Sequence, residues 1–321
     1  MQRIRVAVLR GGPGVESDVS MKSGKNVLEN LSDKYIPMDV FVAKDKSWYL
    51  DGISISPEKV FKNTDVVFNA MHGEYGEDGK VQQLMDHFGV KYTGSKALAS
   101  ALGMNKVLAK DIFIKAGLKT PIYKVIRKGD NIEGLDHTIF KTFPMPAIVK
   151  PGGSGSSIGV SLVKVLKDII PAIEKALKYS DIIIVEEFIK GKEATCGVVE
   201  KFRKEAIYPL LPVEITTPKE FEFFGYDAKY SGCSGEICPG NFSENEKKII
   251  QGMAVEAHRV LGLRHYSRSD FIVSPKRGIY ILEVNTLPGL TKESLLPKSL
   301  DAVGCDLSYF LDHVITLALE Q

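Results

Sequence analysis

The sequence has little excess charge, few cysteines and no long apolar run. Its 321 residues include 42 lysines and arginines against 40 aspartates and glutamates, and this balance gives no sign of a general nucleic-acid binder. No apolar run reaches the roughly 20 residues of a membrane-spanning helix, and the first apolar stretch is too short for a signal peptide. We therefore expect no membrane association and a cytoplasmic location. The cysteines lack zinc-site spacing and are predicted to be free thiols. They are Cys196, Cys233, Cys238 and Cys305.

What is present resembles an ordinary α/β protein. Hydrophobic residues make up 44% and charged residues 26%, as in soluble globular proteins. The length suggests two or three subdomains of about 100–200 residues each. Short apolar runs followed by glycine-rich loops and helices predict a parallel sheet with ligands at the carboxyl ends of its strands. We place the subdomains at residues 1–95, 96–200 and 201–321.

The expected elements follow the apolar patterns. In the first stretch they are strands at Ile4–Leu9 and Asp65–Met71 and helices through Leu31 and near Lys80–Phe88. Further on they are a helix near Ala97–Ala116, strands at Pro146–Pro151 and Asp181–Ile189, a helix at Ser243–Leu261, two strands and a C-terminal helix ending near Leu319. The polar segment 216–240 is too long for an ordinary connection and is rich in glycine and aromatic residues. We predict a mobile loop there that closes as a lid.

A predicted hairpin near the C-terminus carries three oxygen-bearing side chains. If its turn is centred near Lys276 and Arg277, Asp270 faces Glu283 and Val273 faces Tyr280. Asn285 then shares a face with Glu283, because side chains alternate along a strand. Two facing carboxylates repel unless a cation lies between them, and oxygen ligands suit Mg²⁺. Three solvated polar positions are the alternative, and the neighbouring Arg268 favours the metal site.

Three loops follow predicted strands. Lys150 precedes a Gly/Ser loop whose backbone N–H groups could approach phosphate, although the order of residues is not that of the P-loop, and a plain surface loop is the alternative. His72 follows a buried strand. It could act as a base or as a donor to the substrate, or it could be a structural histidine. Glu77 and Asp78 are acidic residues suited to the start of the next helix. Glu16, after the first strand, would cap a helix or bind an ammonium group; from this pattern alone we favour capping.

Together the motifs resemble the D-alanine–D-alanine ligases, a branch of the ATP-grasp enzymes. They occur in the family's order and cover nearly the whole chain. The motifs are GGPGVESDVS (11–20), HGEYGEDGKVQ (72–82), GSKALASALGMNK (94–106), VKPGGSGSSIG (149–159), VEEFIKGKE (185–193), YDAKYSGCSGEICP (226–239), SRSDF (267–271) and LEVNTLPGLTKESLLP (282–297). The resemblance implies an ATP-grasp fold of three α/β subdomains, the first a Rossmann-like parallel sheet, with nucleotide between the second and third.

The resemblance implies ATP as a substrate and two Mg²⁺ or Mn²⁺ ions per site. It assigns Lys106 and Lys150 to the phosphates, Glu186 and Glu193 to adenine and ribose, and Lys229 to the phosphates from the long loop. Glu187 stands where some members place a lysine beside adenine, which puts that contact in doubt. The implied metal ligands are Asp270, Glu283 and Asn285.

The resemblance also implies two D-alanine sites. Glu16 now becomes the ligand of the first D-alanine's ammonium group, with His72 beside it. The second D-alanine's carboxylate is assigned to Ser294 and Leu295. The remaining implied site residues are Ser156 and Tyr230, which would link with Glu16 to close the site, and Arg268 and the Gly289 N–H, which would stabilise the oxyanion.

The activity implied is ATP-dependent joining of two D-alanines through an acyl phosphate, for peptidoglycan precursor synthesis. A ligase using D-lactate or D-serine as second substrate is the nearer alternative; Tyr230 argues against D-lactate. A catalytically silent nucleotide-binding regulator is the remote one, but no metal ligand or phosphate lysine is missing. The family is commonly dimeric, so the resemblance implies a homodimer.

Overall fold

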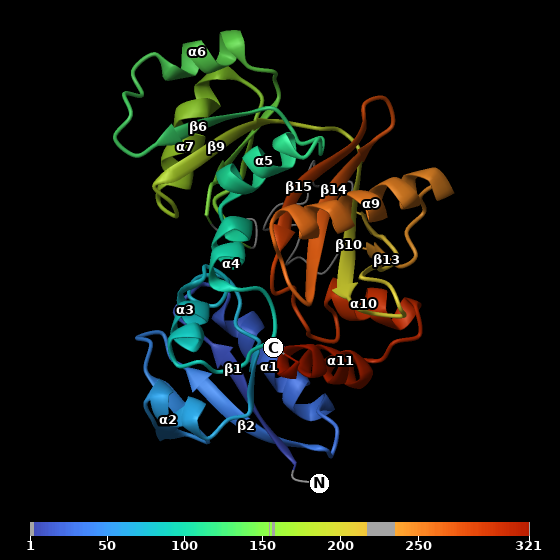
Figure 1. Cartoon of the computed structure of the whole chain (residues 1–321). Helices are drawn as coiled ribbons and strands as arrows, with labels where there is room; N and C mark the ends of the chain where they lie inside the picture. Colours follow the sequence, from blue (N-terminus) through green and yellow to red (C-terminus); the bar gives the residue numbers. More distant parts are fainter. Residues whose placement is uncertain (1–2, 154, 156–157, 217–234, 321) are drawn as a thin grey trace.

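The computed structural model describes residues 3–153, 155, 158–216 and 235–320, which form three sheets with helices between them (Figure 1). The predicted α/β class is confirmed. Of the cysteines, Cys196, Cys238 and Cys305 are free thiols, as predicted, and Cys233 lies outside the described residues.

The first sheet has five strands in the order β4-β3-β2-β1-β5. Its central strand, β1, pairs in parallel with β2 and β5, so the loops that follow β1 and β5 leave from the same edge. These loops carry Glu16 and His72. The strands are β1 (Ile4–Gly11), β2 (Tyr35–Val42), β3 (Trp48–Leu50), β4 (Ile53–Ser54) and β5 (Val66–Asn69), and the helices are α1 (Ser17–Asn30), α2 (Pro57–Lys62) and α3 (Lys80–His87).

The second sheet is antiparallel and has the strand order β6-β9-β7-β8. Buried apolar residues of β7 and β9 face α7, for example Val149, Ile183 and Ile173. Because β7 and β9 are adjacent, Lys150 and Glu186 can meet across them. The elements are β6 (Tyr123–Arg127), α6 (Leu135–Thr142), β7 (Ala147–Pro151), β8 (Ser161–Val163), η1 (Leu166–Asp168), α7 (Ile169–Leu177) and β9 (Ile182–Glu187).

The third sheet has the path β13-β12-β10-β14-β15, with β11 on the side of β10. Strand β10 falls before the boundary we placed at residue 200, yet it pairs with β14 along its length. The division at that residue stays a prediction. The elements are β10 (Lys192–Glu200), β11 (Ile207–Pro209), β12 (Val213–Thr216), β13 (Gly235–Ile237), α9 (Glu244–Val260), β14 (Tyr266–Ser274) and β15 (Gly278–Asn285).

The helix predicted near residues 97–116 is in fact two, α4 (Ala97–Met104) and α5 (Lys106–Lys115). The break is at Asn105, whose side chain accepts hydrogen bonds from the N–H groups of Val107 and Leu108 at 3.1 Å. This is the capping that asparagine provides at a helix start. The new helix start aims α5 along the third sheet, where Ala109 and Phe113 are buried in the core.

Two C-terminal helices, α10 (Leu295–Ala302) and α11 (Leu307–Leu319), replace the single one predicted. Phe310 and Val314 of α11 are buried in one cluster with Val6 and Phe68 of the first sheet. Burial of each such side chain is worth about 1.5–3 kcal/mol, so this contact fastens the C-terminal segment to the N-terminal sheet. No single helix among the described residues is long and apolar enough to span a membrane; α10 and α11 pass that test only as a pair bent by 102°.

Candidate active site

A cavity of about 490 Å³ is lined by residues of the second and third sheets, by the loops after β1 and β5 of the first sheet, and by the helices beside them. Every predicted site residue that the structure describes lies on its wall, although they come from ten separate stretches of sequence. These residues are Glu16, His72, Lys106, Lys150, Glu186, Glu193, Arg268, Asp270, Glu283, Asn285, Gly289, Ser294 and Leu295. The structure therefore brings the predicted groups together; the role of each stays a prediction.

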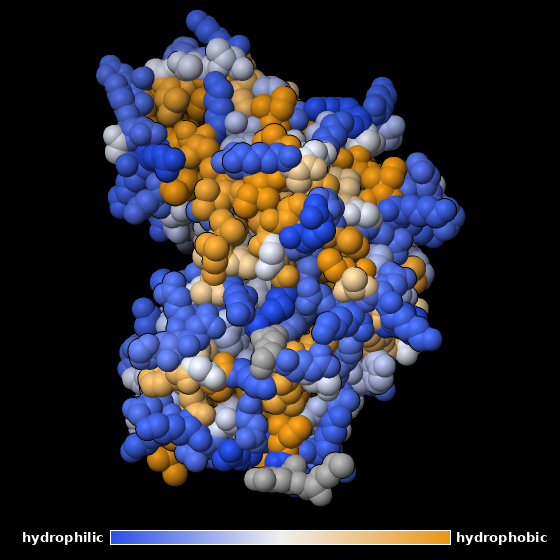
Figure 2. Space-filling view, viewed as in Figure 1, coloured by the Kyte–Doolittle hydropathy of each residue, from blue (hydrophilic) through white to orange (hydrophobic). Residues whose placement is uncertain are grey.

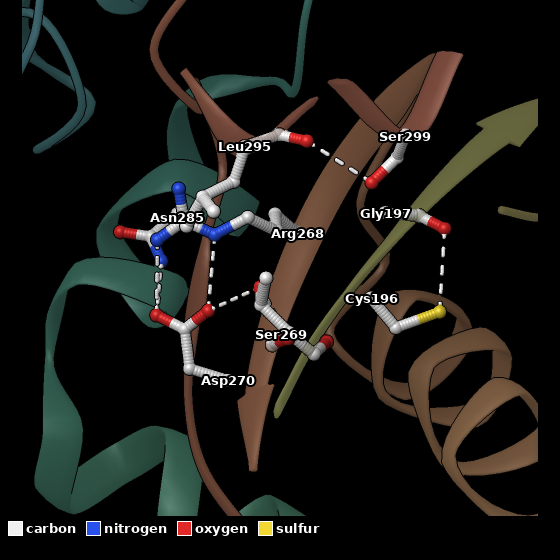
Figure 3. A network of polar contacts seen from close by, with 9 residues as sticks. Cys196, Gly197, Arg268, Ser269, Asp270, Asn285, Leu295 and Ser299 are labelled. Atoms are coloured by element: carbon white, nitrogen blue, oxygen red, sulfur yellow. Dashed lines mark hydrogen bonds and ion pairs between the residues drawn. The ribbon is translucent and has the colours of Figure 1, made fainter. Parts of the chain in front are cut away.

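The β14–β15 hairpin carries the predicted metal ligands. Asp270 is paired with Glu283 in the strand register, as predicted. Asp270 accepts hydrogen bonds from Arg268 Nε and Nη2 at 3.0 Å, from Asn285 Nδ2 at 3.1 Å and from Thr195 Oγ1 at 2.6 Å (Figure 3). This network fixes the orientation of the Asp270 carboxylate and of the Arg268 guanidinium together.

The hairpin also corrects one prediction. Val273 pairs with Ile279, and Tyr280 with Ile272, because the register shifts by one residue between Asp270 and Phe271. A β-bulge of this kind re-aims side chains on one side of it. On the other side of the bulge, the predicted pairing of Asp270 with Glu283 holds.

The donor set at this hairpin fits a hard divalent cation. Burial acts to raise the pKa of Glu283, but the charges of Lys106, Lys150 and Arg268 outweigh it and lower that pKa to about 2. Lys106 Nζ lies 3.2 Å from Glu283 Oε2. Glu283 is thus an ionised oxygen donor beside Asp270, and carboxylate oxygens are what Mg²⁺ prefers.

Lys150 and Glu186 of the second sheet line the cavity, and Lys110 lies behind them in the same buried cluster. Lys150 Nζ lies 2.6 Å from Glu186 Oε1, and Lys110 Nζ lies 3.0 Å from Glu186 Oε2. Burial acts to raise the pKa of Glu186, but the two ammonium groups hold it below its usual value. Burial lowers the pKa of Lys110 to about 8. We did not predict Lys110; its spacing of four residues from Lys106 on one helix was the signal available.

Glu77 was predicted to favour the start of a helix, but it does something else. It is buried and lines the cavity. Its Oε2 accepts from Gly73 N at 2.8 Å, and its Oε1 accepts from Leu287 N at 2.9 Å. Burial, and then the nearby Glu16 charge, raise its pKa to about 7. Asp78, by contrast, accepts from Lys80 N at 3.0 Å, at the helix start as predicted.

His72 is held between Ser23 of α1 and the loop that contains Leu287. Its Nδ1 lies 2.9 Å from the Leu287 carbonyl, which can only accept, so Nδ1 carries a proton; Nε2 lies 2.8 Å from Ser23 Oγ. Ser23 Oγ in turn accepts from Leu290 N at 3.1 Å. These contacts favour a positioning role for His72 over a role as general base.

Glu16 stands at the N-cap position of α1 but makes no side-chain capping bond, so the capping interpretation is wrong. Its carboxylate is close to two glycines: an added Cβ at Gly73 or at Gly155 would lie 2.4 or 2.5 Å from Glu16 Oε2. Any larger residue at either position would displace the carboxylate. The loops after β5 and β7 therefore close on Glu16.

Gly289 and Ser294 lie at the start of α10. A Cβ at Gly289 would approach Ser294 Oγ to 2.8 Å, so only glycine fits without a shift. Ser294 Oγ accepts from Thr291 N at 3.1 Å. It does not accept from the first N–H groups of α10, which begins at Leu295. Orphan N–H groups at a helix start are suited to a carboxylate.

The chain was next compared with known proteins. The family model described as D-ala D-ala ligase C-terminus matches residues 112–316, and that described as D-ala D-ala ligase N-terminus matches residues 51–95. The chain belongs to the D-alanine–D-alanine ligase family. It is 39% identical to the D-alanine–D-alanine ligase of Geobacter sulfurreducens over 300 residues, 93% of this chain and 88% of that one. It is 38% identical to that of Syntrophobacter fumaroxidans over 322 residues, 100% and 99% of the two chains.

Solved structures of this ligase family superpose over the full length. The D-alanine–D-alanine ligase of Coxiella burnetii has a TM-score of 0.85 at 26% identity, covering 100% of this chain and 95% of its own. The VanG D-Ala:D-Ser ligase of Enterococcus faecalis has a TM-score of 0.85 at 28% identity, covering 99% and 100%. The predicted ATP-grasp fold follows from these likenesses.

Three ligase residues predicted from the sequence, Ser156, Lys229 and Tyr230, lie outside the described residues. The same is true of most of the predicted lid at 216–240. Their roles stay predictions. The departure at Glu187 now has a physical account: it is buried, pairs with Arg277 at 2.8 Å and accepts from Ile122 N at 3.1 Å.

Proposed function

We propose that this chain is an ATP-dependent ligase that joins two D-alanine molecules into a dipeptide, with ADP and phosphate as the other products. The observation that carries the proposal is one cavity lined by two chemically different sets of groups. One set consists of lysines and the hairpin carboxylates, which suit a triphosphate and its cation. The other set consists of Glu16 and the start of α10, which suit an ammonium and a carboxylate group.

The first step activates a carboxylate. A free carboxylate is a poor acyl donor because its leaving group would be oxide, so the first D-alanine must take the γ-phosphoryl group of ATP and become an acyl phosphate. Lys106 and Lys150 would neutralise the phosphate oxygens during that transfer. Asp270, Glu283 and Asn285 would hold the divalent cation, which neutralises triphosphate charge when bound. We propose two such ions per site.

The second step forms the peptide bond. The amine of the second D-alanine attacks the acyl phosphate carbon, and the carbonyl oxygen becomes an oxyanion. Arg268 and the Gly289 N–H are the donors we assign to that oxygen. Arg268 suits the task because Asp270 fixes its guanidinium at 3.0 Å. The C–O bond to phosphate then breaks and phosphate leaves with the electron pair.

Binding of the two amino acids uses the second set of groups. Glu16 would hold the ammonium group of the first D-alanine, with His72 fixing the loop beside it. Ser294 and the N–H of Leu295 would hold the carboxylate of the second. The site would thus recognise both ends of a small α-amino acid.

Phosphate release with ATP, Mg²⁺ and either D-alanine or L-alanine tests the proposal. Release that depends on D-alanine, with dipeptide formed in equal amount, is the expected result. Equal release with L-alanine, or nucleotide binding without turnover, would contradict it, and the second outcome would favour a silent regulator. D-serine and D-lactate, each offered with limiting D-alanine, would reveal a ligase with a different second substrate.

The setting of the reaction is part of the same proposal. We place the enzyme in the cytoplasm, where ATP is available, as a source of dipeptide for peptidoglycan precursors. We propose a homodimer on the family prior. Sedimentation of the purified chain would test that assembly directly.

A further inference from the structure

Helix α5 buries a lysine and exposes two apolar side chains, whereas charged side chains are usually exposed and apolar ones buried. The Lys110 side chain is 0% exposed, whereas Leu108 and Ile114 on the same helix are 44% and 55% exposed. Figure 2 shows hydrophobic residues gathered on the face of the molecule where Figure 1 places α5. A buried ammonium group is costly unless it is paired and hydrogen-bonded, so the burial of Lys110 depends on the groups that it contacts.

Lys110 contacts groups of the nucleotide wall. Its Nζ lies 3.0 Å from Glu186 Oε2 and donates to Thr120 Oγ1 at 2.7 Å. The other oxygen of the same carboxylate, Glu186 Oε1, lies 2.6 Å from Lys150 Nζ. Glu186 is thus shared by two ammonium groups, although one would be enough to balance its charge.

We infer that Lys110 is a positioning residue that neutralises Glu186, so that Lys150 is available to the triphosphate. This inference rests on the proposed function. Without Lys110, Lys150 would be the remaining cation on a carboxylate that is only 5% exposed. Moving Lys150 toward phosphate would then leave a buried charge without a partner, which is strongly unfavourable.

The contacts of Lys106 support these separate roles for Lys110 and Lys150. Lys106 lies one turn before Lys110, on the same face of α5, and its Nζ is 3.2 Å from Glu283 Oε2. The helix therefore supplies one ammonium group to the metal-ligand hairpin and another to the base-binding carboxylate. Lys150 interacts with Glu186 directly, and its charge also acts on Glu283.

The test compares two ligands that share a nucleoside but differ in the triphosphate. Dissociation constants are measured for adenosine and for the magnesium complex of adenosine 5′-(β,γ-imido)triphosphate. In Lys110→Met we expect the triphosphate to lose about tenfold or more in affinity relative to adenosine, the worth of one charge-assisted hydrogen bond. The matched control is Lys115→Met, an exposed lysine at the end of the same helix, which should keep the wild-type ratio.

The double variant Lys110→Met/Glu186→Gln removes both charges of the pair and keeps a balanced interior should the single variant fold poorly. Because Glu186 no longer holds Lys150 by charge, adding Lys110→Met to Glu186→Gln should change the affinity ratio less than twofold. An equal loss for adenosine and triphosphate in Lys110→Met would overturn the inference in favour of a structural role. So would an undiminished effect of Lys110→Met in the Glu186→Gln background, which would mean direct action on phosphate. Wild-type ligase assays stand apart from these ratios, so a failure of the proposed function is seen separately.

Discussion

Glu77 connects two loops that are far apart in the sequence, and a single isosteric change tests that connection. One carboxylate oxygen accepts from Gly73 N at 2.8 Å and the other from Leu287 N at 2.9 Å. Glutamine has the same shape but presents one oxygen and one NH₂ group. Above the Glu77 pKa of about 7, where the wild-type carboxylate only accepts, one of the two backbone N–H groups in Glu77→Gln must therefore face a donor instead.

The size of the effect follows from burial. Glu77 is 9% exposed, and an unsatisfied buried donor costs about 1–3 kcal/mol. We expect Glu77→Gln to lower the free energy of unfolding by that amount. Leu287 lies two residues before Gly289, our assigned oxyanion donor, so a displaced loop should also lower kcat by about tenfold, a part of the ~10²–10³ that removal of such a donor costs.

Urea unfolding and phosphate release measure the two effects. The control is Glu74→Gln, the same chemical change at an exposed position of the same loop, which should leave both values near those of the wild type. If Glu77→Gln matched this control in stability and in kcat, the carboxylate would not be what joins the loops. A loss of stability with unchanged kcat would separate the loop connection from the oxyanion donor.

The remaining predictions concern the hairpin and a buried histidine. Asp270→Asn and Glu283→Gln should each abolish phosphate release while circular dichroism shows an intact fold; wild-type rates at ordinary magnesium would rule out the ligand assignment. Arg268→Ala should lower kcat by ~10²–10³ with little change in ATP affinity, and a raised ATP KM at unchanged kcat would make it a nucleotide contact. His265, which accepts from Gly94 N at 3.1 Å, has its pKa lowered by burial to about 3, so the folded state binds its proton later than the unfolded state as the pH falls. Stability should drop by up to about 1.4 kcal/mol per pH unit below pH ~6.5, and His265→Asn should flatten that slope in urea titrations; an unchanged slope would assign it to other groups.

Local patterns predicted the parallel core of the first sheet and the position of most helices. They did so because buried strands read as apolar runs and amphipathic helices repeat every 3.6 residues. Two errors have a common cause. The break at Asn105 and the bulge after Asp270 each depend on one residue's backbone conformation, which apolar periodicity does not record. Strands β2 to β4 and β10 to β13 are short or mixed in pattern, and we predicted none of their pairings.

The motif residues of the site could be predicted from the sequence, whereas two buried residues beside them could not. Motif residues such as Lys150 and Glu283 were named in advance because the resemblance supplies their order along the chain. Lys110 and Glu77 were not, since their importance comes from burial and from partners distant in the sequence. Glu77 meets Leu287 only because α10 and α11 pack on the first sheet, and no local pattern encodes that long-range contact.

Two groups of residues at the site are therefore stabilised by different forces. In the first, Lys110, Lys150 and Glu186 hold one another by charge among buried side chains, and removing one charge leaves another unpaired. In the second, Glu77 and His72 bind backbone N–H and C=O groups, so perturbation there moves loops and leaves the charge balance of the first group intact. It follows that changes at Lys110 should appear as altered triphosphate affinity and changes at Glu77 as altered kcat. Combining Lys110→Met with Glu77→Gln should give nearly additive changes in the free energies of triphosphate binding and of activation, because the two groups share no side chain. A coupling energy above about 0.5 kcal/mol would show that the two groups are energetically linked.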